Sequence, residues 1–244
     1  MINISKAIKS FQGLFRPVLN EVNLTLEKGD FCVLIGTNGS GKSTLLKLIS
    51  GEYSADSGEI RCKGNVAQVT QDINLGTVPE ITVLENIALS EAKPPKLLFY
   101  NRYRNIATHK LKELGVGLEN YIDQPMKMLS GGQKQMVATL IAINSGCKIL
   151  LLDEHTSALD PKTQVILMDY TTKQIAQRNL TTIMVTHKMD DAIKYGNRLM
   201  MMHQGKIVMD IHKEQKQSLT VQNLLTLFYQ YEDQCLRSGG NHDN

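Results

Sequence analysis

Residues 36–44 read GTNGSGKST and combine three glycines with a lysine that is followed by two hydroxyl side chains. This is the pattern G-x-x-x-x-G-K-[ST], in which backbone N–H groups surround phosphate oxygens. Glycines permit the backbone turns that point successive N–H groups at one anion. The loop therefore predicts a binding site for a nucleoside triphosphate. Its expected ligand-binding residues are Gly36, Thr37, Asn38, Gly39, Ser40, Gly41, Lys42, Ser43 and Thr44.

The residues around this loop supply the elements that such a site requires. An apolar, β-branched run at 31–35 predicts a buried strand, and residues 45–49 predict a helix. The helix would add its partly positive N-terminus to the loop. Lys42 would place a cation on the terminal phosphates and take part in catalysis, and Ser43 would offer a hydroxyl to Mg²⁺. A glycine-rich turn with a chance lysine would not need both flanking elements.

Two acids follow a second apolar run, residues 149–152. A continuous apolar strand of this kind is covered on both faces of a sheet. Its carboxyl end is where α/β sheets place ligands. Asp153 suits the Mg²⁺ shell, and Glu154 suits the base that polarises an attacking water. The plainer alternative is a capped strand end.

A second anion-binding element is predicted at 129–133, LSGGQ, at the start of a helix. Ser130 followed by two glycines leaves backbone N–H groups exposed at a helix N-terminus. Alone, the same residues would make an ordinary turn with an N-cap. One chain with two phosphate-binding elements calls for an explanation beyond a single self-contained site.

These motifs together resemble the ATP-binding subunits of ABC transporters, over residues 2–230. In that family GTNGSGKST corresponds to the Walker A loop, LSGGQ to the ABC signature and ILLLDE to the Walker B strand. Gln71 in VTQD corresponds to the Q-loop glutamine, residues 157–160 (SALD) to the D-loop, and His187 in MVTHK to the switch histidine.

The resemblance implies a head-to-tail homodimer with ATP and Mg²⁺ at its interface. Each ATP would lie between Walker A of one subunit and the signature of the other. His187 would contact the γ-phosphate and hold the attacking water in line, and Gln71 would serve catalysis and Mg²⁺. The further nucleotide contacts implied are Ser130, Gly131, Gly132, Gln133 and Asp160.

The chain departs from the family pattern after Glu154 and leaves one assignment open. His155 stands where most of the family has proline, and we expect a small change in D-loop geometry without loss of activity. The family also stacks an early aromatic ring on adenine. Phe11 fits this role better by position than Phe15, and one of the two is expected to pack in the core.

The segments LLDEHTSALDPKT and MVTHKMDDAIKYGNRLMMMHQGKIVMDI resemble more narrowly the ATPases of a bacterial importer group. That group works with a substrate-binding protein and a single kind of permease subunit, and some members are linked to tryptophan or related amino acids. Alternatives are a non-transport ABC ATPase, and a P-loop kinase or GTPase, which LSGGQ and His187 disfavour.

Composition describes an ordinary globular protein. The 244 residues are 42% hydrophobic and 21% charged, with a net charge of +3 that is too small to indicate nucleic acid. No apolar run approaches the roughly 18 residues of a membrane helix, and the N-terminus lacks a secretory apolar region. We expect a peripheral protein on the cytoplasmic face of the inner membrane, held there by permease subunits. The four scattered cysteines predict reduced thiols.

The predicted fold class is α/β. A P-loop ATPase core with a mostly parallel sheet would carry an antiparallel β subdomain and an inserted helical subdomain at about 76–145, all within one domain, 1–230. A hairpin is expected around Gln204-Gly205 and a short amphipathic helix at 220–228. Residues 231–244 are expected to be a disordered tail.

A basic, aromatic stretch at 96–112 has two interpretations. It can belong to a larger region, residues 72–112, that forms the groove for a cytoplasmic helix of a permease, with Phe99, Tyr100, Arg102 and Tyr103 exposed on its surface. The alternative is nucleic acid, which we do not expect as a partner.

Overall fold

The computed structural model describes residues 1–70, 72, 76–91 and 100–238. It divides into two compact units, Met1–Cys62 with Ile183–Asn244, and Lys63–Thr182. The division falls within β7 (Thr181–Val185). It does not coincide with the predicted helical segment at 76–145, which stays a prediction.

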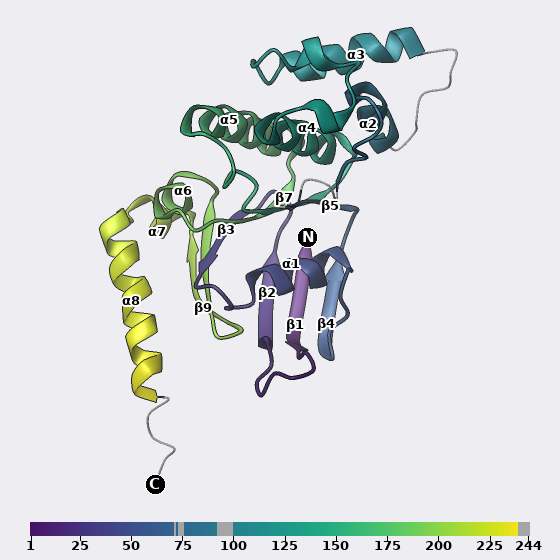
Figure 1. The fold of residues 1–244 in the computed structure, drawn as a ribbon. Helices are drawn as coiled ribbons and strands as arrows, with labels where there is room; N and C mark the ends of the chain where they lie inside the picture. The colour runs from purple at the N-terminus through teal and green to yellow at the C-terminus, as the bar shows by residue number, and fades with distance from the viewer. Residues whose placement is uncertain (71, 73–75, 92–99, 239–244) are drawn as a thin grey trace. The chain divides into compact units, whose positions relative to one another are not determined.

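The first unit contains a three-stranded antiparallel sheet (Figure 1). β1 (Ile2–Lys9) lies between β2 (Leu19–Leu26) and β4 (Ser57–Cys62). Ile4 pairs with Leu24 on one side and with Ile60 on the other, so apolar residues share one face. This is the antiparallel β element that the sequence predicts.

A second group of strands in the first unit carries the phosphate loop. β3 (Phe31–Gly36) pairs in parallel with β8 (Arg198–His203), and β8 pairs antiparallel with β9 (Lys206–His212). Every residue of β3 is buried, as its apolar sequence predicts. The β8–β9 hairpin turns at Gln204 and Gly205, both with positive φ, which confirms the predicted hairpin.

Helices complete the first unit. α1 (Lys42–Ser50) follows the phosphate loop, and α6 (Met189–Lys194), α7 (Lys213–Gln217) and α8 (Val221–Ser238) lie in the C-terminal part. α8 contacts α6. It is much longer than the helix predicted at 220–228, so the prediction of a disordered tail is wrong for residues 231–238. Residues 239–244 lie outside the described residues.

The second unit combines two strands with helices. β5 (Val66–Val69) pairs in parallel with β6 (Ile149–Asp153). The helices are α2 (Val83–Ser90), α3 (Tyr100–Lys112), α4 (Gly131–Asn144) and α5 (Pro161–Arg178), with 3-10 turns η3 (Leu118–Tyr121) and η4 (Met126–Met128). Thr82 and Glu85 form a capping box at the start of α2.

Burial corrects one prediction about α3. Tyr103 is only 8% exposed and its hydroxyl donates to Glu91 Oε1 at 3.4 Å, so it is a core residue and not a surface anchor. Burial raises the pKa of Tyr103. The position of Phe99 lies outside the described residues, as do the side chains of Tyr100 and Arg102.

The cysteines agree with reduced core thiols. Cys32, Cys62 and Cys147 are free, and Cys32 and Cys147 are buried. Burial raises the pKa of the Cys147 thiol, which keeps it protonated and unreactive.

Candidate nucleotide site

The phosphate loop joins β3 to α1 within the first unit, and its backbone requires glycine. Gly36, Gly39 and Gly41 have φ of 152°, 76° and 104°. A Cβ on Gly36 would stand 2.3 Å from the Met202 carbonyl oxygen, and one on Gly41 would stand 2.7 Å from Leu19 Cδ2. At Gly36 and Gly41 side chains are therefore excluded both by conformation and by the strands that pack against the loop, and at Gly39 they are disfavoured by conformation alone.

The loop concentrates groups that bind anions. Lys42 is the first residue of α1 and is 6% exposed, and its Nζ donates to the carbonyls of Gly36 at 2.9 Å and Thr37 at 2.8 Å. The N-cap of α1 is Gly41, so no side chain caps the first N–H groups of the helix. These N–H groups and the Lys42 ammonium are suited to phosphate oxygens.

Two hydroxyls of the loop differ in their surroundings. Ser40 Oγ is buried and has no hydrogen-bond partner in the described part of the chain, an arrangement that a ligand oxygen would satisfy. Ser43 is exposed. A buried polar atom without a partner is costly, so the loop is better satisfied with an anion than without one.

The β8–β9 turn supports the loop from below, and sequence reasoning missed this contact. Gly205 N donates to Ser40 O at 3.0 Å, and Asn20 N donates to Gly205 O at 2.9 Å. The Gln204-Gly205 pair predicts a turn. Because this turn is far from the phosphate loop in sequence, no sequence pattern predicts that Gly205 contacts Ser40.

The segment that carries His187 lies beside β3. Thr186 N donates to Leu34 O at 3.3 Å, two residues before Gly36, and Lys188 N donates to Thr186 Oγ1 at 3.1 Å. His187 itself is exposed. His187 therefore follows the carboxyl end of β7, and the phosphate loop follows the carboxyl end of the neighbouring strand β3.

Neither candidate aromatic for adenine packs in the core, so that expectation is wrong. Phe15 is fully exposed and lines a cavity of about 780 Å³, together with Gly39 and the turn at Gln204 and Gly205. Phe11 is half-buried and contacts Tyr53 edge to face, with ring centres 5.4 Å apart.

In the second unit, β6 ends at Asp153 and the chain turns at Glu154. Both are partly exposed. Glu154 has a φ of 48°, a left-handed conformation that is strained for a non-glycine residue, and Ser157 N donates to Glu154 O at 2.9 Å. Such strain is common at functional sites.

His155 is a buried side chain directly after Glu154. It is 2% exposed, and its Nε2 has no hydrogen-bond partner among the described residues. Burial lowers its pKa to about 4, so the imidazole is neutral at physiological pH. The expected mild effect on D-loop geometry stays a prediction.

The signature starts α4 in the way that an anion-binding helix needs. Ser130 Oγ accepts from Gln133 N at 3.3 Å, and Gln133 Oε1 accepts from Ser130 N at 2.9 Å. Ser130 and Gly131 are exposed, and a Cβ on Gly132 would meet Leu159 Cδ2 at 3.2 Å. The glycines keep the helix N-terminus open.

Asp160 caps α5. Its Oδ1 accepts from Thr163 N and Lys162 N, both at 3.1 Å, and Pro161 occupies the first helical position. Hydrogen bonds from Thr163 and Lys162 hold the pKa of Asp160 below its usual range. Gln71 lies outside the described residues.

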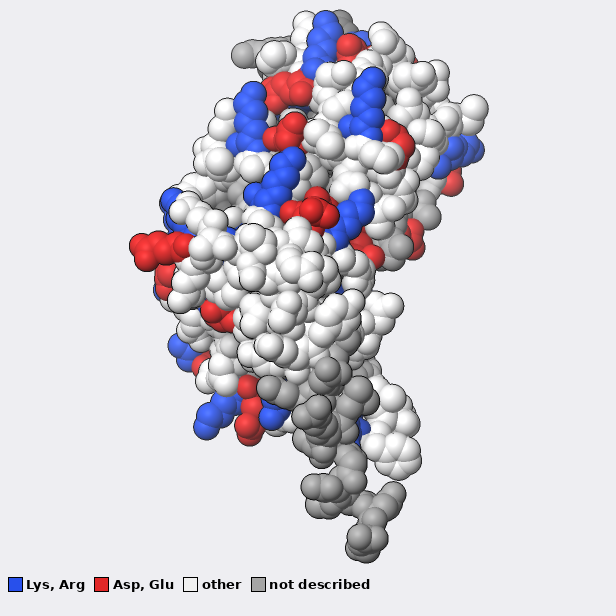
Figure 2. Space-filling view, turned by 90° about the vertical axis from the view of Figure 1, so that its left-hand side faces the viewer, with Lys and Arg blue, Asp and Glu red and all other residues white. Residues whose placement is uncertain are grey.

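Three further properties of the described residues concern the requirements of a metal site, a membrane span and a charged binding surface. Within the described residues, histidine, cysteine, aspartate and glutamate form no group of three or more arranged to hold a metal ion. No helix of that part is long and apolar enough to cross a membrane. On the face in Figure 2, cationic and anionic side chains are interspersed and do not form a stripe of one sign.

Three comparisons decide the family. A family model described as ABC transporter matches residues 19–157. The tyrosine transport ATP-binding protein of Clostridioides difficile (strain R20291) is 38% identical, over 93% of this chain and 96% of that protein. The glutamine transport ATP-binding protein GlnQ of Geobacillus stearothermophilus is 34% identical, over 85% and 89%. The chain belongs to the ATP-binding subunits of ABC transporters.

A solved structure agrees. The ATP-binding cassette MJ0796, in a dimeric post-hydrolysis state bound to ADP and Pi, has a TM-score of 0.76 at 25% identity, covering 87% of this chain and 99% of that one. The predicted α/β ABC ATPase fold, with a mostly parallel sheet, a small antiparallel sheet and a helical insertion, is confirmed. So is the predicted function: this ABC ATPase hydrolyses ATP to energise an importer.

Proposed function

We propose that ATP binds to this ABC ATPase at residues 36–44, with Lys42 on the terminal phosphates. The observation that carries this is the loop itself, because three glycines, an uncapped α1 and a buried ammonium converge there. The Lys42 ammonium now donates to two loop carbonyls, and a phosphate oxygen would take over these donors.

The donor set of the chain fits Mg²⁺. This ion keeps several waters and takes one or two protein ligands in addition to phosphate oxygens. An exposed hydroxyl at Ser43 and the carboxylate of Asp153 are ligands of that kind, and Gln71 is the third predicted one. When bound, Mg²⁺ would neutralise charge on the phosphates.

Glu154 and His187 carry the chemistry in this proposal. Glu154 accepts a proton from the attacking water, and His187 donates to the γ-phosphate and keeps that water in line. Gln71 assists both. The left-handed backbone of Glu154 supports the assignment, since strain of this kind is retained where function requires it.

We place two copies of the chain in a head-to-tail homodimer. Ser130, Gly131, Gly132 and Gln133 would contact the ATP held by the partner's phosphate loop, with Asp160 beside them. The open N-terminus of α4 supports this role, and the similar cassette MJ0796 is dimeric in its nucleotide-bound structure.

Adenine would stack on Phe11, with Phe15 as the alternative. Phe11 keeps the positional match, whereas Phe15 lines the cavity beside Gly39. Separate Phe11→Ala and Phe15→Ala variants decide between them: the variant that raises the Kd for ATP identifies the stacking ring.

The transported solute is proposed to be an amino acid, and aromatic ones such as tyrosine are the first to test. A 38% identical relative is a tyrosine transport ATP-binding protein. The ATPase would bind permease subunits at the cytoplasmic face of the inner membrane, with a substrate-binding protein acting on the permease and no role for nucleic acid.

Uptake by the assembled transporter tests the proposal. The wild-type subunit should co-purify with a permease from membranes and support ATP-dependent tyrosine uptake in vesicles. A subunit that brings down no permease would overturn the assignment of partners, and uptake of other amino acids without tyrosine would redirect the substrate.

A further inference from the structure

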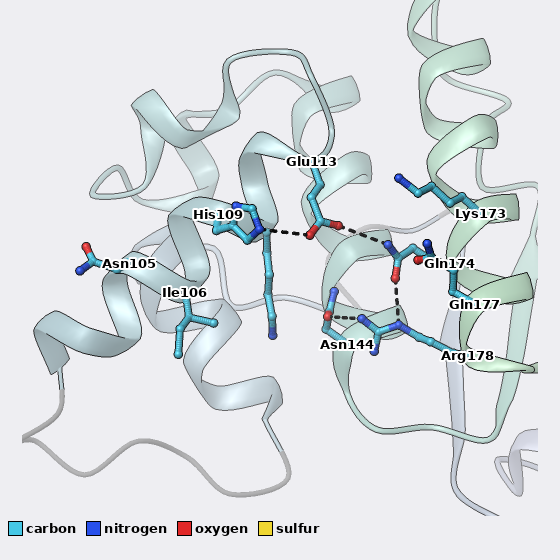
Figure 3. Close-up of a pocket in the computed structure, with 10 residues that line it drawn as sticks. Asn105, Ile106, His109, Glu113, Asn144, Lys173, Gln174, Gln177 and Arg178 are labelled. Carbon is cyan, nitrogen blue, oxygen red and sulfur yellow. Dashed lines mark hydrogen bonds and ion pairs between the residues drawn. The ribbon is translucent and has the colours of Figure 1, made fainter.

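A cleft in the second unit has no residue of the nucleotide motifs in its lining. It has a volume of about 830 Å³ and is bounded by α3 on one side and the second half of α5 on the other (Figure 3). Asn144, the last residue of α4, lies between them. The proposed nucleotide contacts have no member here, so the cleft calls for its own explanation.

One buried amide organises the polar groups of this cleft. Gln174 is 5% exposed; its Nε2 donates to Glu113 Oε2 at 3.2 Å, and its Oε1 accepts from Arg178 Nε at 2.9 Å. The amide therefore lies between a carboxylate and a guanidinium. Asn144, 8% exposed, fixes the far side of the guanidinium by accepting from Arg178 Nη2 at 2.8 Å.

Two cations of the cleft, Arg178 and Lys173, have no carboxylate partner among the described residues. Arg178 donates to Gln174, Asn144 and the Ile143 carbonyl, which are all neutral, and a guanidinium has five N–H groups. Within the described part of the chain, the other two N–H groups have no acceptor. Lys173 makes no hydrogen bond or ion pair in the described ranges and lines the same cleft.

Among the described residues, the carboxylate of Glu113 likewise has no lysine or arginine partner. Its contacts are the Gln174 amide and His109 Nε2, 3.9 Å from Oε1, which is charged only when protonated. Lys110 also lines the cleft, but it pairs with Glu91, at 2.6 Å. The cleft thus presents a negative group and two positive groups on either side of one amide.

This polarity defines a ligand. A molecule lying along the Gln174 amide would need an anionic acceptor toward Arg178 and Lys173 and a cationic donor toward Glu113. The anionic and cationic groups of this ligand must lie close together, because the donor and acceptor of the Gln174 amide lie close together. In an α-amino acid the ammonium and carboxylate are about 3 Å apart by covalent geometry, with matching polarity.

We propose that the cleft between α3 and α5 binds a free α-amino acid. Its carboxylate is held by Arg178 and Lys173 and its ammonium by Glu113. The side chain has room in the remaining volume, where Ile106 offers an apolar wall. None of the residues that line the cleft belongs to the phosphate loop.

Calorimetric titration of the nucleotide-free chain tests the requirement for both charges. L-alanine should bind saturably with one site, whereas acetate and methylammonium, which each carry half of its charges, should bind at least about tenfold more weakly. Absence of saturable L-alanine binding would overturn the proposal. Equal binding of acetate would also overturn it, by showing a simple anion site.

Matched variants localise the binding. Glu113→Gln and Lys173→Gln should each weaken L-alanine binding about tenfold, while Glu80→Gln and Lys112→Gln, at exposed positions outside the cleft, should not. Both cleft side chains are exposed, and circular dichroism checks that the variants fold. Lys42→Ala should bind L-alanine as the wild type does. Undiminished binding in Glu113→Gln would place the amino acid elsewhere.

Discussion

At the scale of single residues, Lys42 places a nearly buried positive charge in the phosphate loop. Its ammonium donates to the carbonyls of Gly36 and Thr37. Carbonyls offer only partial charge, so an anionic phosphate is a better partner. The buried Ser40 hydroxyl in the same loop has no hydrogen-bond partner among the described residues, so it would also gain from a ligand oxygen.

We predict that Lys42→Ala lowers ATP hydrolysis by at least about 100-fold, because charge-assisted contacts to the phosphates are lost. The domain should still fold, at a cost of about 1–3 kcal/mol for the lost hydrogen bonds. Lys47→Ala on the same helix is the control, since Lys47 pairs with Glu52 at the surface, at 2.9 Å. Steady-state turnover and chemical denaturation measure both. Normal turnover in a folded Lys42→Ala protein would exclude the assignment.

A second residue-scale prediction concerns Glu154. Glu154→Gln keeps the side-chain shape and the left-handed backbone but loses the basic oxygen, so hydrolysis should slow at least about 100-fold. ATP should still bind and hold a dimer together, which size-exclusion chromatography with ATP and Mg²⁺ would detect. Full activity would remove Glu154 as the base, and a variant that stays monomeric at saturating ATP would argue against the dimer.

At the scale of elements, two capping boxes offer a matched pair. Ser130 with Gln133 starts α4, and Thr82 with Glu85 starts α2 in the same way. An N-cap replaced by alanine costs about 0.5–2 kcal/mol of stability. The structural part of the two substitutions should therefore be similar.

We predict that Ser130→Ala and Thr82→Ala lower the free energy of unfolding by similar amounts, while only Ser130→Ala reduces ATP turnover. The reason is that Ser130 has a second role at the partner's nucleotide in the proposed dimer. Urea denaturation and an ATPase assay on both variants measure the two effects. Equal turnover in both would leave Ser130 as a cap alone.

Much of the element scale follows from local sequence. The capping boxes, the Asp160-Pro161 start of α5 and the Gln-Gly hairpin depend on neighbouring residues, and all are present. Burial of Tyr103, exposure of Phe15 and the length of α8 depend on distant packing that single-sequence patterns do not contain. The cleft around Gln174 is of the same kind, because three helices contribute to it.

At the scale of the whole molecule, the proposed dimer draws its functional residues from two copies of the chain. The first unit holds the phosphate loop and His187, and the second holds Asp153, Glu154 and the signature. If the signature serves the partner's ATP, a lesion in the loop and a lesion in the signature affect complementary halves of each composite site.

This gives a prediction for mixed dimers. Lys42→Ala and Ser130→Arg should each abolish turnover in their own homodimers. In a heterodimer of the two, one site combines an intact Lys42 with an intact Ser130, and the other carries both lesions. The mixture should therefore recover part of the hydrolysis that neither variant shows alone. Because catalysis requires the complete set of positioned groups only within one site, sites that act independently would give up to about half of the wild-type rate per dimer. Native mass spectrometry confirms that heterodimers form, and an ATPase assay measures the recovery. Heterodimers without recovered activity would argue either that each chain has a self-contained site or that the two sites must fire together.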